Sequence, residues 1–203
     1  MPADSTVRQE KEIKAVFLYN FTRFVDWPSH SLETGSAPFV IGILGTDPFG
    51  TVLDEVVRGE KSNDRPLVVK RFDRLEAVTN CHVLFVSRSE TARLPAILKY
   101  LATQSVLSVS DIDGFAEAGG MIALVTANGK VRLKVNLDSA RQAHLGISSK
   151  LLRPSQLVSS PKPNTSWKRV PGDNVPFARK KARIVRAFNL PHDSDAWKPG
   201  MYQ

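Results

Sequence analysis

The sequence predicts an α/β domain: a single mixed, largely parallel sheet flanked by helices, with an antiparallel hairpin near the C-terminal half. Two patterns support this. Continuous apolar runs typical of buried strands alternate with amphipathic segments typical of helices, which favours helices packed on a parallel sheet. Later, Asn128-Gly129, a strong tight-turn signal, separates two further apolar runs. With 203 residues and 42% hydrophobic content, the chain is long enough for one well-buried domain.

The first half opens with an amphipathic helix, because apolar residues recur at helical spacing until Pro28 stops the pattern. A fully apolar strand follows. Asp47 and Pro48 then suggest the N-cap and first residue of a short helix that ends at Gly59. The predicted elements are, in order, a helix over 10–25, a strand over 39–44, a helix from 47 to 59 and a strand over 66–71.

The second half continues the alternation and then changes it. The Asn128-Gly129 turn predicts a hairpin at one edge of the sheet, and Asp138 is the expected cap of the helix that follows. The predicted elements are strands over 82–86 and 106–109 around a helix over 94–101, hairpin strands over 121–126 and 131–135, a helix over 138–143 and an amphipathic segment over 148–158.

The net charge of +8 is concentrated at one end of the chain. From Ser159 onward nine basic residues stand against three acidic ones, in a stretch rich in Pro, Ser, Asn and Lys. We therefore predict a domain over residues 10–158 and a basic tail over 159–203.

No apolar run approaches the roughly 18 residues of a membrane span, and the first residues lack the basic and apolar regions of an export signal. These features leave the compartment open. A single cysteine, Cys81, excludes a disulfide within the chain and a cysteine-rich zinc site.

Two glycine-containing loops were tested as phosphate sites. Such a loop needs its glycines between a strand and a following helix. Gly119 and Gly120 lead into a strand instead, so we interpret them as positions of close backbone approach or positive φ, with anion binding as the alternative. Loop 45–51 does lie between a strand and a helix, but Thr51 occupies the place of the P-loop lysine.

No catalytic or metal-binding constellation emerges, and no cofactor is predicted. Cys81 and His82 are adjacent on a strand, so their side chains point to opposite faces and cannot form a dyad; a buried thiol and a capping or core histidine is the alternative. The other histidines, His30, His144 and His192, lack metal-ligand spacing. The segment 111–113 suggests either a cation site or an ordinary acidic loop.

Four motifs in register resemble the YfiR-like family, DUF4154. They are IKAVFLYNFTRFVDWP (13–28), IGILGTDPFG (41–50), CHVLFVS (81–87) and the long run from Val106 to Leu152 that contains GFAEAGGMIAL and ISSKLL. The resemblance covers about residues 10–158. The single Cys81 departs from disulfide-bearing members, Lys134 stands where an acidic residue is more usual, and Pro154 breaks the expected ending.

The resemblance implies an exported bacterial protein of mixed α/β fold that acts in the periplasm without catalysis. Its expected partner is the periplasmic domain of an inner-membrane diguanylate cyclase, whose restraint lowers cyclic-di-GMP and biofilm formation. Members also occur as sensory modules of signalling proteins. A homodimer stays open, and nucleic acid is not an expected partner.

The resemblance also points to candidate site residues. For the partner surface, with a cap and a core helix as the alternative, they are Asn136, Arg141, Ile147, Ser148, Ser149, Leu151 and Leu157. For a small anionic ligand such as a nucleotide monophosphate, with solvated arginines as the alternative, they are Arg65, Arg71 and Arg153.

Other functions remain as alternatives. The segment 178–188 of the tail places apolar residues beside a basic cluster, which suggests nucleic-acid or membrane-surface binding against a merely solvated tail. An enzyme on the α/β body stays open because a fold does not decide function.

Overall fold

The computed structural model describes residues 2–28 and 37–160. His30, His192 and the basic segment 178–188 therefore lie outside the described residues, as does most of the predicted tail. Among the described residues, no helix is long and apolar enough to span a bilayer.

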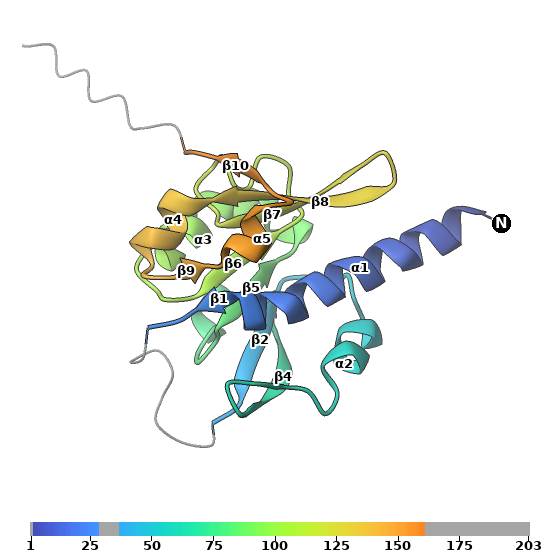
Figure 1. The fold of residues 1–203 in the computed structure, drawn as a ribbon, viewed down its shortest axis with the longest axis horizontal. Helices are drawn as coiled ribbons and strands as arrows, with labels where there is room; N and C mark the ends of the chain where they lie inside the picture. Colours follow the sequence, from blue (N-terminus) through green and yellow to red (C-terminus); the bar gives the residue numbers. More distant parts are fainter. Residues whose placement is uncertain (1, 29–36, 161–203) are drawn as a thin grey trace, which may run out of the picture. The chain divides into compact units, whose positions relative to one another are not determined.

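The described chain forms an eight-stranded main sheet and a separate two-stranded antiparallel sheet (Figure 1). The main sheet contains β2 (Phe39–Leu44), β3 (Lys61–Ser62), β4 (Arg65–Phe72), β5 (Val83–Val86), β6 (Leu107–Ser110), β7 (Ile122–Ala127), β8 (Lys130–Asn136) and β10 (Gln156–Val158), and the small sheet pairs β1 (Val25–Asp26) with β9 (Gly146–Ile147). The strand order is β10-β8-β7-β6-β5-β2-β4-β3, and the five strands from β7 to β4 are parallel. The predicted mixed, largely parallel sheet is thus confirmed.

Helices cover both faces of this sheet. The helices are α1 (Pro2–Phe24), α2 (Thr51–Val57), α3 (Leu94–Leu101), α4 (Leu137–Gln142) and α5 (Ser149–Leu152), with short 3-10 turns η2 (Leu75–Ala77) and η3 (Arg88–Arg93). Strand β2 divides its side chains between two cores. Phe39, Ile41 and Ile43 join the core that includes α1, α2, α4 and α5, whereas Val40 and Leu44 join the core that includes α3. All six of its residues are buried, as the apolar run predicts.

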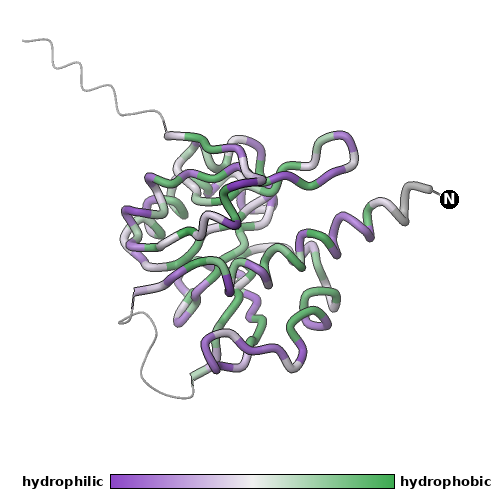
Figure 2. Tube along the Cα trace, viewed as in Figure 1, coloured by the Kyte–Doolittle hydropathy of each residue, from purple (hydrophilic) through white to green (hydrophobic). Residues whose placement is uncertain are grey.

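Helix α1 lies across one face of the sheet and begins earlier than predicted. Hydrophilic and hydrophobic positions alternate along it (Figure 2), and its inward side chains Ala15, Leu18 and Phe21 are fully buried. Lys14, although charged, is only 8% exposed, and its Nζ lies 2.8 Å from Asp111 Oδ2 at the carboxyl end of β6. This ion pair joins the helix to the sheet.

The predicted cap at Asp47 is wrong. Helix α2 begins at Thr51, with Gly50 as its N-cap. Asp47 instead accepts a hydrogen bond from Phe49 N at 2.7 Å through Oδ1 and pairs with Arg71 through Oδ2. The carboxylate closes a local turn before the helix and satisfies an arginine from β4.

The predicted cap at Asp138 is also wrong, by two residues. Asn136 is the N-cap of α4, because its Oδ1 accepts a hydrogen bond from Ser139 N at 3.1 Å. Asp138 lies within the first turn, where its charge faces the positive end of the helix.

The hairpin is confirmed, but its place at the edge is not. Ala127 pairs with Lys130, and Asn128 and Gly129 both have positive φ, as a two-residue hairpin turn requires. However, β10 pairs in parallel with β8 and becomes the outer strand. The predicted amphipathic segment over 148–158 is accordingly split into the four-residue α5 and this strand.

Candidate functional site

The family-like motifs of the C-terminal half converge on buried Asn136. This side chain is fully buried, and its Nδ2 donates to Ala116 O and to Ser160 Oγ, both at 2.8 Å. Together with the cap on Ser139, these bonds join α4, the loop before β7 and the chain after β10. Asn136 is therefore a structural residue, and we leave it out of the partner surface proposed below.

The glycine pair before β7 serves backbone geometry. Gly119 has φ +112, which favours glycine, and a side chain at Gly120 would overlap the Phe115 ring. Gly120 N donates to Phe115 O at 2.9 Å, which closes the loop. The interpretation as close approach and positive φ is confirmed.

Residues 147–151 are fixed by the fold to different degrees. Ile147 is half-buried and pairs with Val25 of β1. Ser148 caps α5, since its Oγ accepts a hydrogen bond from Lys150 N at 3.3 Å. Leu151 is 5% exposed and belongs to the core beneath α1. For Ser148 and Leu151 the structure fits the alternative of a cap and a core helix.

Three of the candidate partner residues are exposed. Arg141 and Ser149 lie on the outer surfaces of α4 and α5, and Leu157 of β10 is 56% exposed. The C-terminal elements that carry them gather at one end of the described domain, away from α2 and β4 (Figure 1). Leu157 is one of four large hydrophobic side chains that the described part of the chain exposes.

Lys134, which departs from the expected family pattern, is engaged within the domain. Its Nζ lies 2.6 Å from Glu117 Oε1 in the loop before β7. The hydrogen bond from Lys134 lowers the pKa of the Glu117 carboxyl, and burial opposes it only in part. The lysine therefore holds this loop against β8.

The three candidate arginines do not form one site. Arg65 and Arg71 are six residues apart on extended β4, a distance of about 20 Å, and Arg153 is an exposed residue after α5. Arg71 donates to Asp54, to Asp47 and to Gly50 O, and the hydrogen bonds to Asp54 and Asp47 raise the pKa of its guanidinium. We therefore leave Arg71 out of any anion site.

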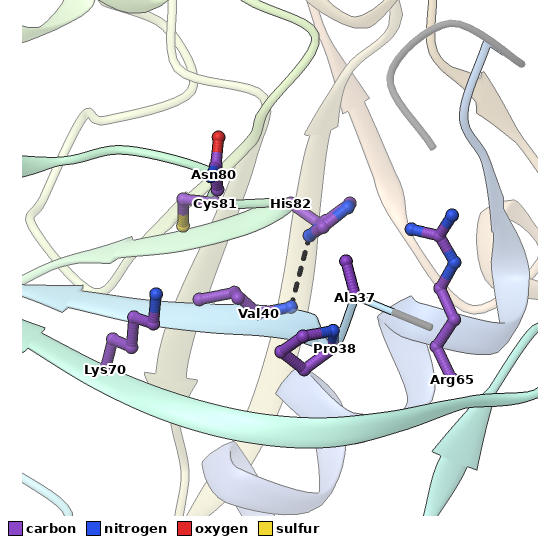
Figure 3. Close-up of a pocket in the computed structure, with 8 residues that line it drawn as sticks. All are labelled: Ala37, Pro38, Val40, Arg65, Lys70, Asn80, Cys81 and His82. Carbon is purple, nitrogen blue, oxygen red and sulfur yellow. Dashed lines mark hydrogen bonds between the residues drawn. The ribbon is translucent and has the colours of Figure 1, made fainter. Parts of the chain in front are cut away.

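Arg65, in contrast, lines a small cavity. The cavity has a volume of about 130 Å³ and opens where β2 and β4 begin and the chain enters β5 (Figure 3). Its lining combines basic, polar and apolar side chains: Ala37, Pro38, Val40, Arg65, Lys70, Asn80, Cys81 and His82. The sequence indicated Arg65, but no local pattern marks Lys70 and Asn80 as its neighbours, because strand pairing brings them together.

His82 is held in this wall by three contacts. Its Nδ1 accepts a hydrogen bond from Val40 N at 3.1 Å (Figure 3), so the ring proton resides on Nε2. The ring stacks on Phe39 with centroids 4.3 Å apart. The backbone oxygen of His82 accepts a hydrogen bond from Trp27 Nε1 at 3.3 Å. The Trp-Pro and Cys-His motifs thus meet beside the cavity.

Cys81 has a protonated thiol. Burial raises its pKa to about 12, and its Sγ donates to Val83 O at 3.0 Å. Because Cys81 bonds to Val83 and His82 Nδ1 accepts from Val40, the two side chains do not act as a nucleophile and base. The buried thiol and capping histidine are confirmed.

The carboxyl ends of the parallel strands are the usual ligand site in a doubly wound sheet. Here the crevice between β2 and β5 is filled by the chain itself: Thr46 N donates to Ser89 Oγ at 2.9 Å, and Glu90 is 3% exposed and paired with Arg93. A side chain at Gly45 would contact Ser89 and would lie 2.7 Å from Glu90 Oε1. A buried carboxylate at this position disfavours a phosphate.

The acidic segment 111–113 pairs with basic side chains. Asp111 contacts Lys14 and Arg88, and Arg88 also lies 3.7 Å from Asp113. Within residues 2–28 and 37–160, no group of three His, Cys, Asp or Glu side chains is arranged to hold a metal ion. The structure therefore favours the acidic-loop interpretation over the cation site.

Comparison with known proteins assigns this fold to a family. A family model described as DUF4154, YfiR/HmsC-like, matches residues 11–156. No curated protein matches the chain significantly.

Proposed function

The chain belongs to the YfiR/HmsC-like family, a family of periplasmic regulators in cyclic-di-GMP signalling, and from this premise we propose that it restrains an inner-membrane diguanylate cyclase by binding that enzyme's periplasmic domain. Restraint of the cyclase lowers cyclic-di-GMP and biofilm formation. The protein acts by contact, without catalysis, and it works in the periplasm.

The chemistry of the described residues supports contact rather than catalysis. Ser89 and Glu90 fill the crevice at the carboxyl ends of β2 and β5, Cys81 carries a protonated thiol, and Arg71 is saturated by carboxylates and a backbone oxygen. Each group that resembles catalytic machinery is used for internal structure.

The exposed Leu157 on an outer strand carries the choice of surface. β10 is the last strand of the main sheet in the described chain, and outer strands offer backbone groups to a partner strand. Leu157 supplies an apolar anchor beside them. Arg141 and Ser149 extend this surface, Ile147 and Ser148 form its half-buried rim, and Leu151 supports it from the core.

Two leucines from the same segment test this surface. Leu157→Ala should weaken capture of the cyclase domain by about 30-fold, which corresponds to about 2 kcal/mol, and leave the melting temperature unchanged. Leu151→Ala should instead lower the free energy of unfolding by about 2–5 kcal/mol and reduce capture only in proportion to the unfolded fraction. Val7→Ala is the matched control, because Val7 is 53% exposed on α1.

Equal capture by wild type and Leu157→Ala would move the interface away from β10. In cells, deletion of the protein should raise cyclic-di-GMP. If the folded wild-type protein binds no resident cyclase and its deletion leaves cyclic-di-GMP unchanged, the regulator proposal fails and family membership alone stands.

A sensory ligand-binding module is the second candidate, and the cavity beside His82 favours it. Nucleic-acid or membrane binding through 178–188, ligand binding by Arg153 and a homodimer stay predictions.

A further inference from the structure

We propose that the cavity beside His82 binds a small oxyanion, such as inorganic phosphate, sulfate or the carboxylate of a small acid. This site goes beyond the proposed contact with a cyclase and does not depend on it. It lies at the amino ends of β2, β4 and β5, on the opposite edge of the parallel strands from the crevice that Ser89 and Glu90 fill.

The charge of the lining selects for an anion. Arg65 and Lys70 bring two cationic groups, and the described lining contains no carboxylate. A guanidinium has five N–H donors in a fork that matches carboxylate and phosphate oxygens, so Arg65 can hold an anion alongside its other partners. At 9% exposure, Arg65 acts where solvent screening is weak.

Polar and apolar groups complete the site. Asn80 contributes an amide to the wall, and the His82 ring, held by Val40 N on Nδ1, carries its proton on Nε2. Pro38, Val40 and Cys81 add apolar surface. A few polar groups set in a mostly apolar concave wall are typical of small-ligand sites.

The volume limits the ligand to a small group. A cavity of about 130 Å³ equals the share of about four water molecules in the liquid, at about 30 Å³ each. A phosphate, a sulfate or a small carboxylate fits this space. A whole nucleotide does not, since pockets for ligands of that size span about 300–1,000 Å³.

Cys81 makes a site-specific test possible, because it is the only cysteine of the chain and lines the cavity. The experiment measures the rate at which N-ethylmaleimide alkylates Cys81 in the full-length protein, with increasing phosphate, sulfate or acetate and with sodium chloride at matched ionic strength. We expect at least one oxyanion to slow alkylation in a saturable manner, while chloride does not.

Variants separate this cavity from other basic regions. Lys70→Gln is the main one, since Lys70 is exposed and its loss leaves the core intact; it should weaken the protecting anion about tenfold. Lys130→Gln, the matched control, removes the same charge from an exposed site on β8 and should bind as wild type does. Arg65→Gln should abolish protection, and if it fails to fold, Lys70→Gln still decides.

Two results would overturn the proposal. One is alkylation of the wild-type protein that none of the three oxyanions slows beyond the chloride control. The other is protection that Lys70→Gln and Lys130→Gln retain to the same degree, because the anion would then bind outside the cavity. Neither result bears on capture of the cyclase domain.

Discussion

At the scale of single residues, Asn136 shows how a motif residue can act through folding. Its side chain makes three hydrogen bonds without reaching solvent. Removing it leaves Ala116 O and Ser139 N without these partners. A buried group that loses its partner costs free energy that a solvated group does not.

We predict that Asn136→Ala lowers the free energy of unfolding by about 2–4 kcal/mol, from the lost cap and the unsatisfied buried groups. Urea denaturation measures this. The control, Ser148→Ala, removes a cap with a single hydrogen bond and should cost about 1 kcal/mol or less. An Asn136→Ala variant of wild-type stability that fails to bind the cyclase would restore Asn136 to the partner surface.

Residue roles were predictable where local geometry decides them. Gly119 and Gly120 enter a strand rather than a helix, and neighbouring Cys81 and His82 cannot share a proton; both facts follow from the order of residues. The pairing of Arg71 could not be predicted, because Asp54 reaches it only after α2 packs on β4. Sequence spacing does not show which charges are already neutralised in the fold.

At the scale of elements, an ion-pair network fastens α1 to the sheet. Lys14 bonds to Glu10 within the helix and to Asp111 after β6, and Glu10 also accepts a hydrogen bond from Thr126 of β7 at 2.8 Å. The hydrogen bond from Lys14 is the main cause that lowers the pKa of Glu10, and burial opposes it. The carboxylate form of Glu10 therefore stabilises the docked helix.

This lowered pKa gives stability a defined pH dependence. A carboxyl whose pKa is lower in the folded state than its ordinary value of 4.5 contributes stability above that value and loses it as the pH falls through the folded pKa. Glu10→Gln should therefore be less stable than wild type at pH 7, and the difference should shrink between about pH 6 and pH 3. Urea denaturation across this range measures it.

The control for Glu10→Gln is Glu12→Gln, which removes the same charge from a surface pair with Arg8 on the same helix and should cost less at pH 7. A difference between Glu10→Gln and wild type that stays constant over the whole pH range would show that the carboxylate does not fasten α1.

Elements were predictable where one segment contains its own pattern. The apolar run over 39–44 and the helix over 94–101 match β2 and α3 at both ends. The segment over 148–158 was not, because Pro154 interrupts it and its last residues form a strand only by pairing with β8, some twenty residues earlier in the chain. Short strands of this kind are defined by their neighbours rather than by periodicity.

At the scale of the whole described domain, Trp27 connects the proposed anion cavity to the C-terminal surface. Trp27 is buried, packs edge-on against Phe39 and donates to the backbone of His82. It directly follows β1, which pairs with β9, and Ser148 N donates to Phe24 O at 2.9 Å. The cavity wall and the rim of the partner surface therefore share one set of contacts.

We predict that an oxyanion in the cavity slows amide hydrogen exchange at residues 146–148, because an ordered His82 backbone steadies Trp27 and, through it, the pairing of β1 with β9. Trp27→Phe tests this path, since phenylalanine keeps an aromatic ring and lacks the indole N–H. In this variant the anion should still protect Cys81 from alkylation, yet exchange at 146–148 should no longer respond. Equal slowing in wild type and Trp27→Phe would show that the two sites communicate by another route, and slowing in neither would show that they are independent.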